Sequence, residues 1–181
     1  SYENCPIHIH PDGQAALETG DFFTTWANRF DSDMPSTVTQ AVEGGDVFAL
    51  GDGQVEAVAL PGHSLDGMGY WIPDQKMMIL GTLLPRADRP TRWDLPGGCL
   101  PDVLASLKRV ASYNAHSLIP LQGPAIKGTK HVKQVLNQHI EFFETCLANN
   151  GQVSTSVPKP AQTALWYTPH PPWPLEEHES V

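Results

Sequence analysis

Apolar residues along this chain recur with two different periods. Short runs, continuous or alternating with polar residues, predict strands over residues 6–10, 47–50, 55–60, 68–72, 76–80 and 117–120. Helical spacing predicts helices over 102–113 and 131–149, and an interrupted helix over 14–30 with Leu17, Phe22, Phe23, Trp26 and Phe30 on its apolar side. Turn residues favour hairpins at Asp52-Gly53 and at Pro73-Asp74-Gln75. This mixture predicts an α/β sandwich with helices outside two sheets.

The last part of the chain has a different composition. From Val153 onward prolines are frequent and two tryptophans occur, without a helical or a strand period. We therefore expect one domain over residues 1–152 and an extended Pro/Trp-rich tail over 153–181, packed on the domain or on a partner. A chain of 181 residues is long enough for one domain with its own core.

Charge and cysteine content narrow the class of protein. The formal net charge is -9 and the 11 Lys and Arg residues form no cluster, so a nucleic-acid-binding face is not expected. Cys5, Cys99 and Cys146 lie far apart, which favours free thiols and a reducing, cytoplasmic setting. No apolar run approaches the ~20 residues of a membrane helix. We expect a cytoplasmic protein that acts on a small molecule and not on a membrane.

Three of the predicted strands end at short motifs. The motifs are Pro61-Gly62-His63-Ser64, then Gly81-Thr82, then Leu121-Gln122-Gly123-Pro124. Their order and spacing resemble the second half of the metallo-β-lactamase fold, in which these strand ends carry His, Asp and His ligands of a metal centre. The resemblance covers about residues 5–150. It implies an αββα sandwich of which this chain lacks part of the N-terminal half.

Only the first of these three ligands is present, as His63. Thr82 stands where the resemblance expects the bridging aspartate, and Gln122 where it expects the last histidine. A hydroxyl and an amide provide no charge to offset two divalent ions, so a two-metal site is not expected. The prediction is one zinc ion at most, or none. If no metal binds, His63 is a histidine held in a polar pocket by hydrogen bonds.

The family's other signature, H-x-H-x-D-H, has two possible relations to this chain. In one register His8, His10 and Asp12 match it, so that His8, His10 and His63 form a three-histidine zinc site and Asp12 orients the attacking water. In the other register, residues 6–11 are a later strand that ends in His-Pro. The signature then lies before Ser1, and the chain is part of a longer protein.

The resemblance implies a hydrolase of the ester, thioester or lactone class, in which Thr82, Gln122 and Trp93 contact the substrate. The alternative is a non-catalytic descendant, a pseudoenzyme that binds a small molecule or a protein. Three loop arginines could hold an anionic substrate but are expected to be solvated: Arg86, Arg89 and Arg92. Five other histidines are expected at the surface: His116, His131, His139, His170 and His178. An incomplete sandwich exposes apolar sheet surface, which favours a homodimer or a companion chain.

Overall fold

Six strands form the main sheet, in the spatial order β3-β4-β5-β6-β7-β8. The computed structural model describes residues 5–25 and 27–152, so the predicted tail lies outside the described residues. The strands are β3 (Val47–Leu50), β4 (Gly53–Ala59), β5 (Met68–Ile72), β6 (Met77–Ile79), β7 (Ser117–Ile119) and β8 (Ile126–Lys127). All neighbouring strands are antiparallel except β6 and β7, which are parallel and joined through a helix.

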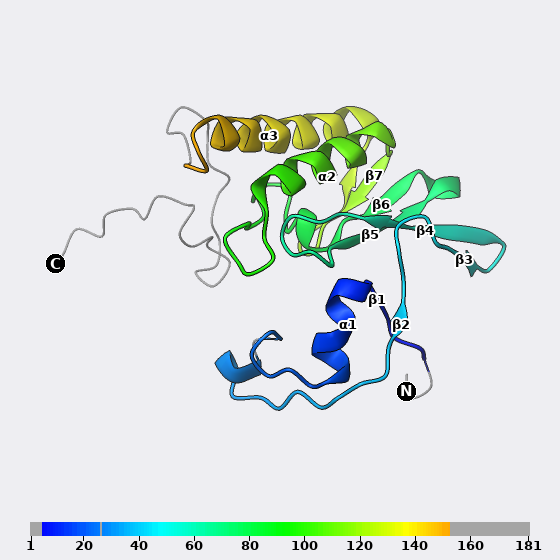
Figure 1. Ribbon diagram of the computed structural model, residues 1–181. Coiled ribbons are helices and arrows are strands. Elements are labelled where there is room, and N and C mark those ends of the chain that lie inside the picture. The colour runs from blue at the N-terminus through cyan, green and yellow to red at the C-terminus, as the bar shows by residue number, and fades with distance from the viewer. Residues whose placement is uncertain (1–4, 26, 153–181) are drawn as a thin grey trace.

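Two long helices, α2 (Leu100–Ser112) and α3 (Thr129–Ala148), cover one face of this sheet (Figure 1). Each turns an apolar stripe toward the sheet, as the helical spacing predicts. The stripes meet strand residues in a single core, whose fully buried members include Val103, Leu107, Val110, Met78, Leu118 and Phe143. This core holds in place the strand ends at which the predicted site lies.

A smaller layer lies on the opposite face of the main sheet (Figure 1). It contains α1 (Pro11–Glu18) and a parallel pair of short strands, β1 (His8–Ile9) and β2 (Gln40–Ala41). Three short 3-10 helices complete the described elements: η1 (Ala27–Arg29), η2 (Pro73–Gln75) and η3 (Gly81–Leu83). The two sheets, with α2 and α3 outside the larger one and α1 beside the smaller one, agree with the predicted αββα fold class (Figure 1).

The predicted helix over residues 14–30 is wrong in extent. Helix α1 starts at Pro11 and stops at Glu18, because Gly20 adopts φ +66° and the Asp21 carboxylate accepts hydrogen bonds from the amides of Phe23 and Thr24. The three phenylalanines predicted on its apolar side are exposed instead, by 40% at Phe22, 72% at Phe23 and 71% at Phe30. Trp26 lies outside the described residues.

No helix in the described part of the chain has both the length and the apolar composition of a membrane span.

Candidate functional site

The Pro-Gly-His-Ser loop follows β4 and is held against the start of α2. The carbonyl of Gly62 accepts a hydrogen bond from the Cys99 amide at 2.9 Å, and that of Pro61 accepts one from the Ser106 hydroxyl at 2.7 Å. Gly62 has φ +135°, and a Cβ atom there would overlap the backbone of Val103. Glycine is therefore required for the loop to lie this close to the helix, and the loop fixes the backbone of His63.

The His63 ring is oriented through Nδ1. This atom lies 3.1 Å from the carbonyl oxygen of Arg92 and 3.3 Å from the hydroxyl oxygen of Thr91. The carbonyl can only accept, and the Thr91 hydroxyl donates its own hydrogen to the carbonyl of Thr82 at 2.7 Å. We therefore assign the hydrogen to Nδ1. In this tautomer Nε2 carries the lone pair and is the nitrogen available to a bound molecule or metal ion.

The ring of His63 is half-buried, and this burial lowers its pKa below the usual 6.5. The hydrogen bond to the Arg92 carbonyl has the next largest effect and raises the pKa; the Arg92 guanidinium lowers it, and the charges of Asp94 and Asp66 raise it. Removal from water dominates because it disfavours the charged ring. His63 is consequently neutral at pH 7, the form that binds metals and accepts protons.

A cavity of about 570 Å³ opens beside His63. Its walls come from three loops: the turn that follows α1, the Pro-Gly-His-Ser loop that follows β4, and the segment that precedes α2. The described lining residues are Phe23, Thr24, Thr25, His63, Ser64, Leu95 and Pro96. The turn keeps its shape because the Asp21 carboxylate also accepts a hydrogen bond from the Thr24 hydroxyl at 2.6 Å. The cavity thus brings a histidine, three hydroxyl groups and three apolar side chains together.

Thr82, Gln122 and Trp93 lie near this region but none of the three lines the cavity. Thr82 belongs to η3 and contributes its backbone carbonyl to Thr91. Gln122 is half-buried, and its backbone N–H donates a hydrogen bond to the carbonyl of Pro85 at 2.9 Å. The indole of Trp93 packs edge-on against the ring of Phe143 in α3, with centroids 5.5 Å apart. Trp93 therefore serves the core.

The structure does not bring His8 and His10 together with His63. The ring of His8 packs edge-on against Phe48, with centroids 5.2 Å apart. His10 precedes α1, where its Nδ1 accepts a hydrogen bond from the Asp12 amide at 3.3 Å and lies 3.5 Å from the Asp12 carboxylate. In the described parts of the chain, no three His, Cys, Asp or Glu side chains are grouped closely enough to hold a metal ion.

The prediction that the loop arginines are solvated is wrong for Arg89, whose side chain is 2% exposed. Arg86 and Arg92 form ion pairs with carboxylates two residues further on, Asp88 and Asp94. The Arg92 pair is largely buried and is doubly hydrogen-bonded, with Nε 2.9 Å from Oδ1. These pairs stiffen the loop that presents the Arg92 carbonyl to His63.

The prediction that His139 lies at the surface is also wrong. It is 3% exposed on the buried side of α3, and its Nε2 donates a hydrogen bond to the carbonyl of Ala87 at 2.9 Å. Its Nδ1 is buried without a partner. The helical period could have revealed this, because His139 follows Val135 and Leu136 on the apolar stripe. His116 and His131 are exposed, as predicted, while His170 and His178 lie outside the described residues.

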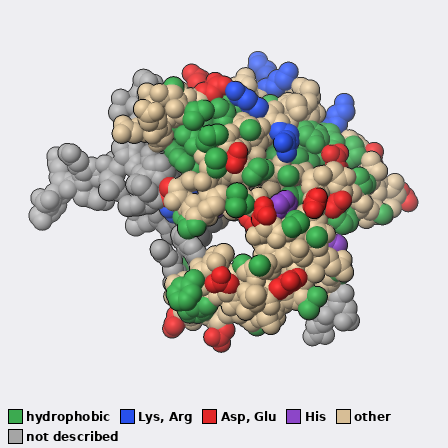
Figure 2. Space-filling model, viewed as in Figure 1, with side chains coloured by type: hydrophobic (Ala, Val, Ile, Leu, Met, Phe, Trp, Pro, Cys, Tyr) green, Lys and Arg blue, Asp and Glu red, His purple; other side chains and the backbone are tan. Residues whose placement is uncertain are grey.

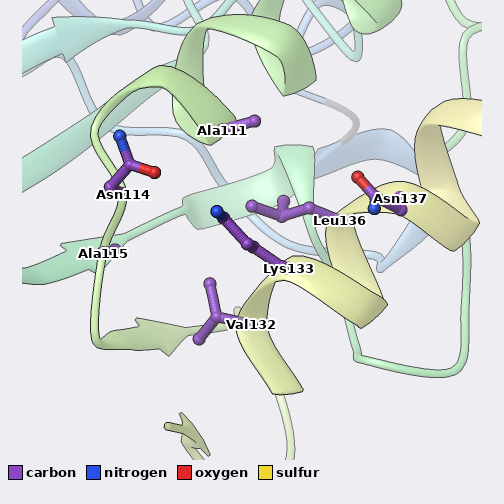
Figure 3. Close-up of a pocket in the computed structure, with 7 residues that line it drawn as sticks. All are labelled: Ala111, Asn114, Ala115, Val132, Lys133, Leu136 and Asn137. Atoms are coloured by element: carbon purple, nitrogen blue, oxygen red, sulfur yellow. The ribbon is translucent and has the colours of Figure 1, made fainter. Parts of the chain in front are cut away.

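A second cavity, of about 300 Å³, lies between the end of α2 and the start of α3 (Figure 3). Its lining residues are Ala111, Asn114, Ala115, Val132, Lys133, Leu136 and Asn137. It shares no lining residue with the His63 cavity.

Comparison with curated proteins gives a local match. The chain is 36% identical over 47 residues to proteins named hydroxyacylglutathione hydrolase from Brucella ovis and Brucella abortus. The match covers 26% of this chain and 18% of those proteins, so it spans less than a fifth of their length. No known family model matches the chain.

Comparison with solved structures gives a match over most of the chain. The protein TTHA1623, solved in a di-iron-bound form, is 25% identical, with a TM-score of 0.58 over 74% of this chain and 66% of its own. The metallo-beta-lactamase family protein TTHA1429 from Thermus thermophilus is 15% identical and has a TM-score of 0.60. The match covers 80% of this chain and 56% of TTHA1429. The BLEG-1 B3 metallo-beta-lactamase is 17% identical and has a TM-score of 0.61. The match covers 74% of this chain and 63% of BLEG-1.

Proposed function

The chain has the metallo-β-lactamase fold, and from that premise we propose that it is a hydrolase-like protein of the ester, thioester or lactone class, centred on His63. The observation that carries the proposal is the arrangement of this one ring. The ring lies at a strand end and lines a cavity. Its Nδ1 donates a hydrogen bond to the Arg92 carbonyl, so Nε2 is the nitrogen that can accept a proton or bind a ligand. The hydrolase names of the curated relatives support the reaction class.

The residues around the cavity can perform part of a hydrolysis themselves. Neutral His63 can accept a proton from a water molecule at Nε2, because the lowered pKa keeps that lone pair free near pH 7. The Ser64 hydroxyl can donate a hydrogen bond to a carbonyl oxygen in the same cavity, whereas the hydroxyls of Thr24 and Thr25 already donate to the carboxylate and the backbone carbonyl of Asp21. One neutral hydroxyl polarises a carbonyl only weakly, so a slow enzyme is expected.

The described residues do not fit a two-metal centre. A metal ion, when bound, would activate water and polarise the carbonyl. Such an ion needs several charged or imidazole ligands, and the described chain groups no three of them. Thr82 and Gln122, at the positions of two expected ligands, are uncharged. The ring of His8 packs against Phe48, and His10 and Asp12 interact with each other at the start of α1. The proposal therefore rests on His63 and allows one metal ion at most.

A second candidate function is a metal-free binding module, a pseudoenzyme that retains the cavity without turnover. The lack of a ligand group in the described chain favours it. In this case His63 holds a small molecule by a hydrogen bond at Nε2.

Elemental analysis of the purified protein, together with a turnover assay, separates these functions. We expect less than one equivalent of zinc or iron per chain. Two tightly held ions would contradict the proposal. Turnover of 4-nitrophenyl acetate, an acyl thioester and a simple lactone should fall at least tenfold, by analogy with other general bases, when His63 is changed to Ala. His116→Ala, at an exposed histidine, is the matched control. If the wild-type protein turns over none of these substrates, the hydrolase proposal is rejected and the binding module remains as the function.

A further inference from the structure

Every described residue that lines the His63 cavity is uncharged. Three are apolar, namely Phe23, Leu95 and Pro96, and three carry hydroxyl groups, namely Thr24, Thr25 and Ser64. The seventh is His63, which burial keeps neutral. The described walls therefore offer a molecule apolar surface and neutral polar groups, and they contain no lysine or arginine to balance a negative charge.

Two described charged side chains close to the cavity, those of Arg92 and Asp21, are already engaged. The Arg92 guanidinium binds the Asp94 carboxylate in a largely buried pair. The Asp21 carboxylate is directed into its own turn, where hydrogen bonds from Thr24 and from the Phe23 amide hold its pKa below the usual value. The chain as a whole carries a formal charge of -9, which repels anions. An anionic group entering the cavity would lose its water without gaining a cation.

Apolar surface continues outward from the cavity. Phe23 is 72% exposed and packs edge-on against Phe22, with ring centroids 5.6 Å apart. Leu65, next to the lining residue Ser64, is also exposed. Figure 2 shows one cluster of hydrophobic side chains at an end of the lobe that contains α1 and η1, next to acidic side chains. Such a rim gains free energy when an alkyl chain or an aromatic ring covers it.

We propose that this cavity selects an uncharged substrate: an ester, thioester or lactone whose aliphatic or aromatic acyl group lies between Phe23 and the Leu95-Pro96 segment. This substrate class rests on the hydrolase-like function proposed above. The acyl carbonyl lies beside His63 and the Ser64 hydroxyl, where Nε2 can accept a proton from the attacking water.

The same neutrality favours release of the product. In hydrolysis the water oxygen bonds to the acyl carbon, the bond to the alcohol oxygen or thiol sulfur breaks, and one water hydrogen goes to that leaving group. The carboxylic acid then gives its proton to solvent and becomes an anion at pH 7. A cavity whose described walls carry no cation binds this carboxylate less tightly than the neutral substrate, so turnover is not slowed by bound product.

The inference can be tested without turnover by measuring how tightly small probes bind to the full chain. Protein NMR titration measures this binding. Hexanamide should bind at least about tenfold more tightly than hexanoate at pH 7.5, because only the latter is charged. Each methylene added between butanamide and hexanamide should tighten binding about twofold to fourfold. Phe23→Ala should weaken hexanamide binding at least threefold. Phe30→Ala is the matched control, because Phe30 is 71% exposed but does not line the cavity.

The outcomes separate this inference from the hydrolase proposal. Equal or tighter binding of hexanoate would overturn the inference, and so would equal effects of Phe23→Ala and Phe30→Ala. Tighter binding of hexanamide without ester turnover would support the inference and reject catalysis. Faster turnover of an ester with a carboxylate on its acyl chain, compared with an uncharged ester of equal length, would uphold catalysis and overturn the inference.

Discussion

The hydroxyl of Thr91 donates a 2.7 Å hydrogen bond to the carbonyl of Thr82, and the oxygen of the same hydroxyl lies 3.3 Å from His63 Nδ1. Two of the strand-end motifs are therefore linked by a residue that belongs to neither. Thr91 is 1% exposed, so no water can replace the hydroxyl without a rearrangement of the loop. Thr91 therefore helps to orient the His63 ring through its contact with Nδ1.

Replacing Thr91 by Val removes the hydroxyl while keeping the shape of the side chain. The Thr82 carbonyl then loses its buried donor, which costs about 1–3 kcal/mol of folding free energy. Urea denaturation measures this loss, and nitrogen NMR of His63 reports the tautomer, which we expect to become mixed. Thr91→Ser keeps the hydroxyl and should retain the wild-type tautomer. An unchanged midpoint and tautomer in the Val variant would mean that the link contributes nothing.

Replacing Gly62 by Ala tests the close approach of the Pro-Gly-His-Ser loop to α2. The new Cβ meets the backbone of Val103 and also strains a residue at φ +135°, so we expect a loss of at least about 2 kcal/mol. Gly45→Ala is the matched control: its φ is +101°, but nothing lies within 4 Å of the added carbon. Thermal unfolding of both variants compares them. Equal losses would assign the whole effect to backbone strain.

The pH dependence of stability should contain a contribution from His139. Burial lowers its pKa below 6.5, more than the Ala87 hydrogen bond and the nearby Asp88 charge raise it. The unfolded chain then binds the proton first as the pH falls. The stabilisation is complete above pH 6.5 and is lost below it, with a slope of at most about 1.4 kcal/mol per pH unit from this group.

His139→Gln keeps a donor for the Ala87 carbonyl and removes the titration. Its free energy of unfolding, measured by denaturant between pH 8 and pH 5, should fall less steeply than that of the wild type. His63 contributes a decline of the same sign in both proteins, because its pKa is lowered too. Parallel pH curves for the two proteins would exclude His139 as a source.

The thiols of Cys5 and Cys146 should differ in reactivity. Cys146 is fully buried in the core and its pKa is raised to about 11, while Cys5 is exposed. A thiol-reactive chromophore should label Cys5 rapidly in the native protein and reach Cys146 only on unfolding, because the thiolate is the reacting form. Cys146→Ser and Cys5→Ser variants assign the two phases. Rapid loss of both thiols from the native protein would contradict the packing of α3.

The sequence predicts well the elements whose pattern is repeated over several residues. Strands β3 and β5 have the predicted bounds, and α2 and α3 begin two residues before theirs, because the pattern of apolar residues does not include the first turn. Strands β1, β2 and β8 contain two residues each, too few for any period. The pattern therefore predicts β1 as too long a strand, and it does not predict β2 and β8.

The site is less predictable than the fold because its contacts connect distant parts of the chain. The strand-end motif indicates His63, but Thr91 reaches it from a loop 28 residues later, in a segment without a period. The helical spacing predicts Phe23 on the apolar side of a helix, and the Asp21 carboxylate places it at the cavity instead. Only tertiary structure reveals such neighbours.

The hydrogen bond from His139 to the Ala87 carbonyl has a consequence for how this protein can change over time. Helix α3 supplies none of the described cavity walls, yet it anchors the loop whose Arg92 carbonyl sets the tautomer of His63. Mutations on the buried side of that helix can therefore retune the reactive nitrogen from a distance while every wall residue stays the same. Selection for a new ligand can therefore act on residues of α3 as well as on residues that line the cavity.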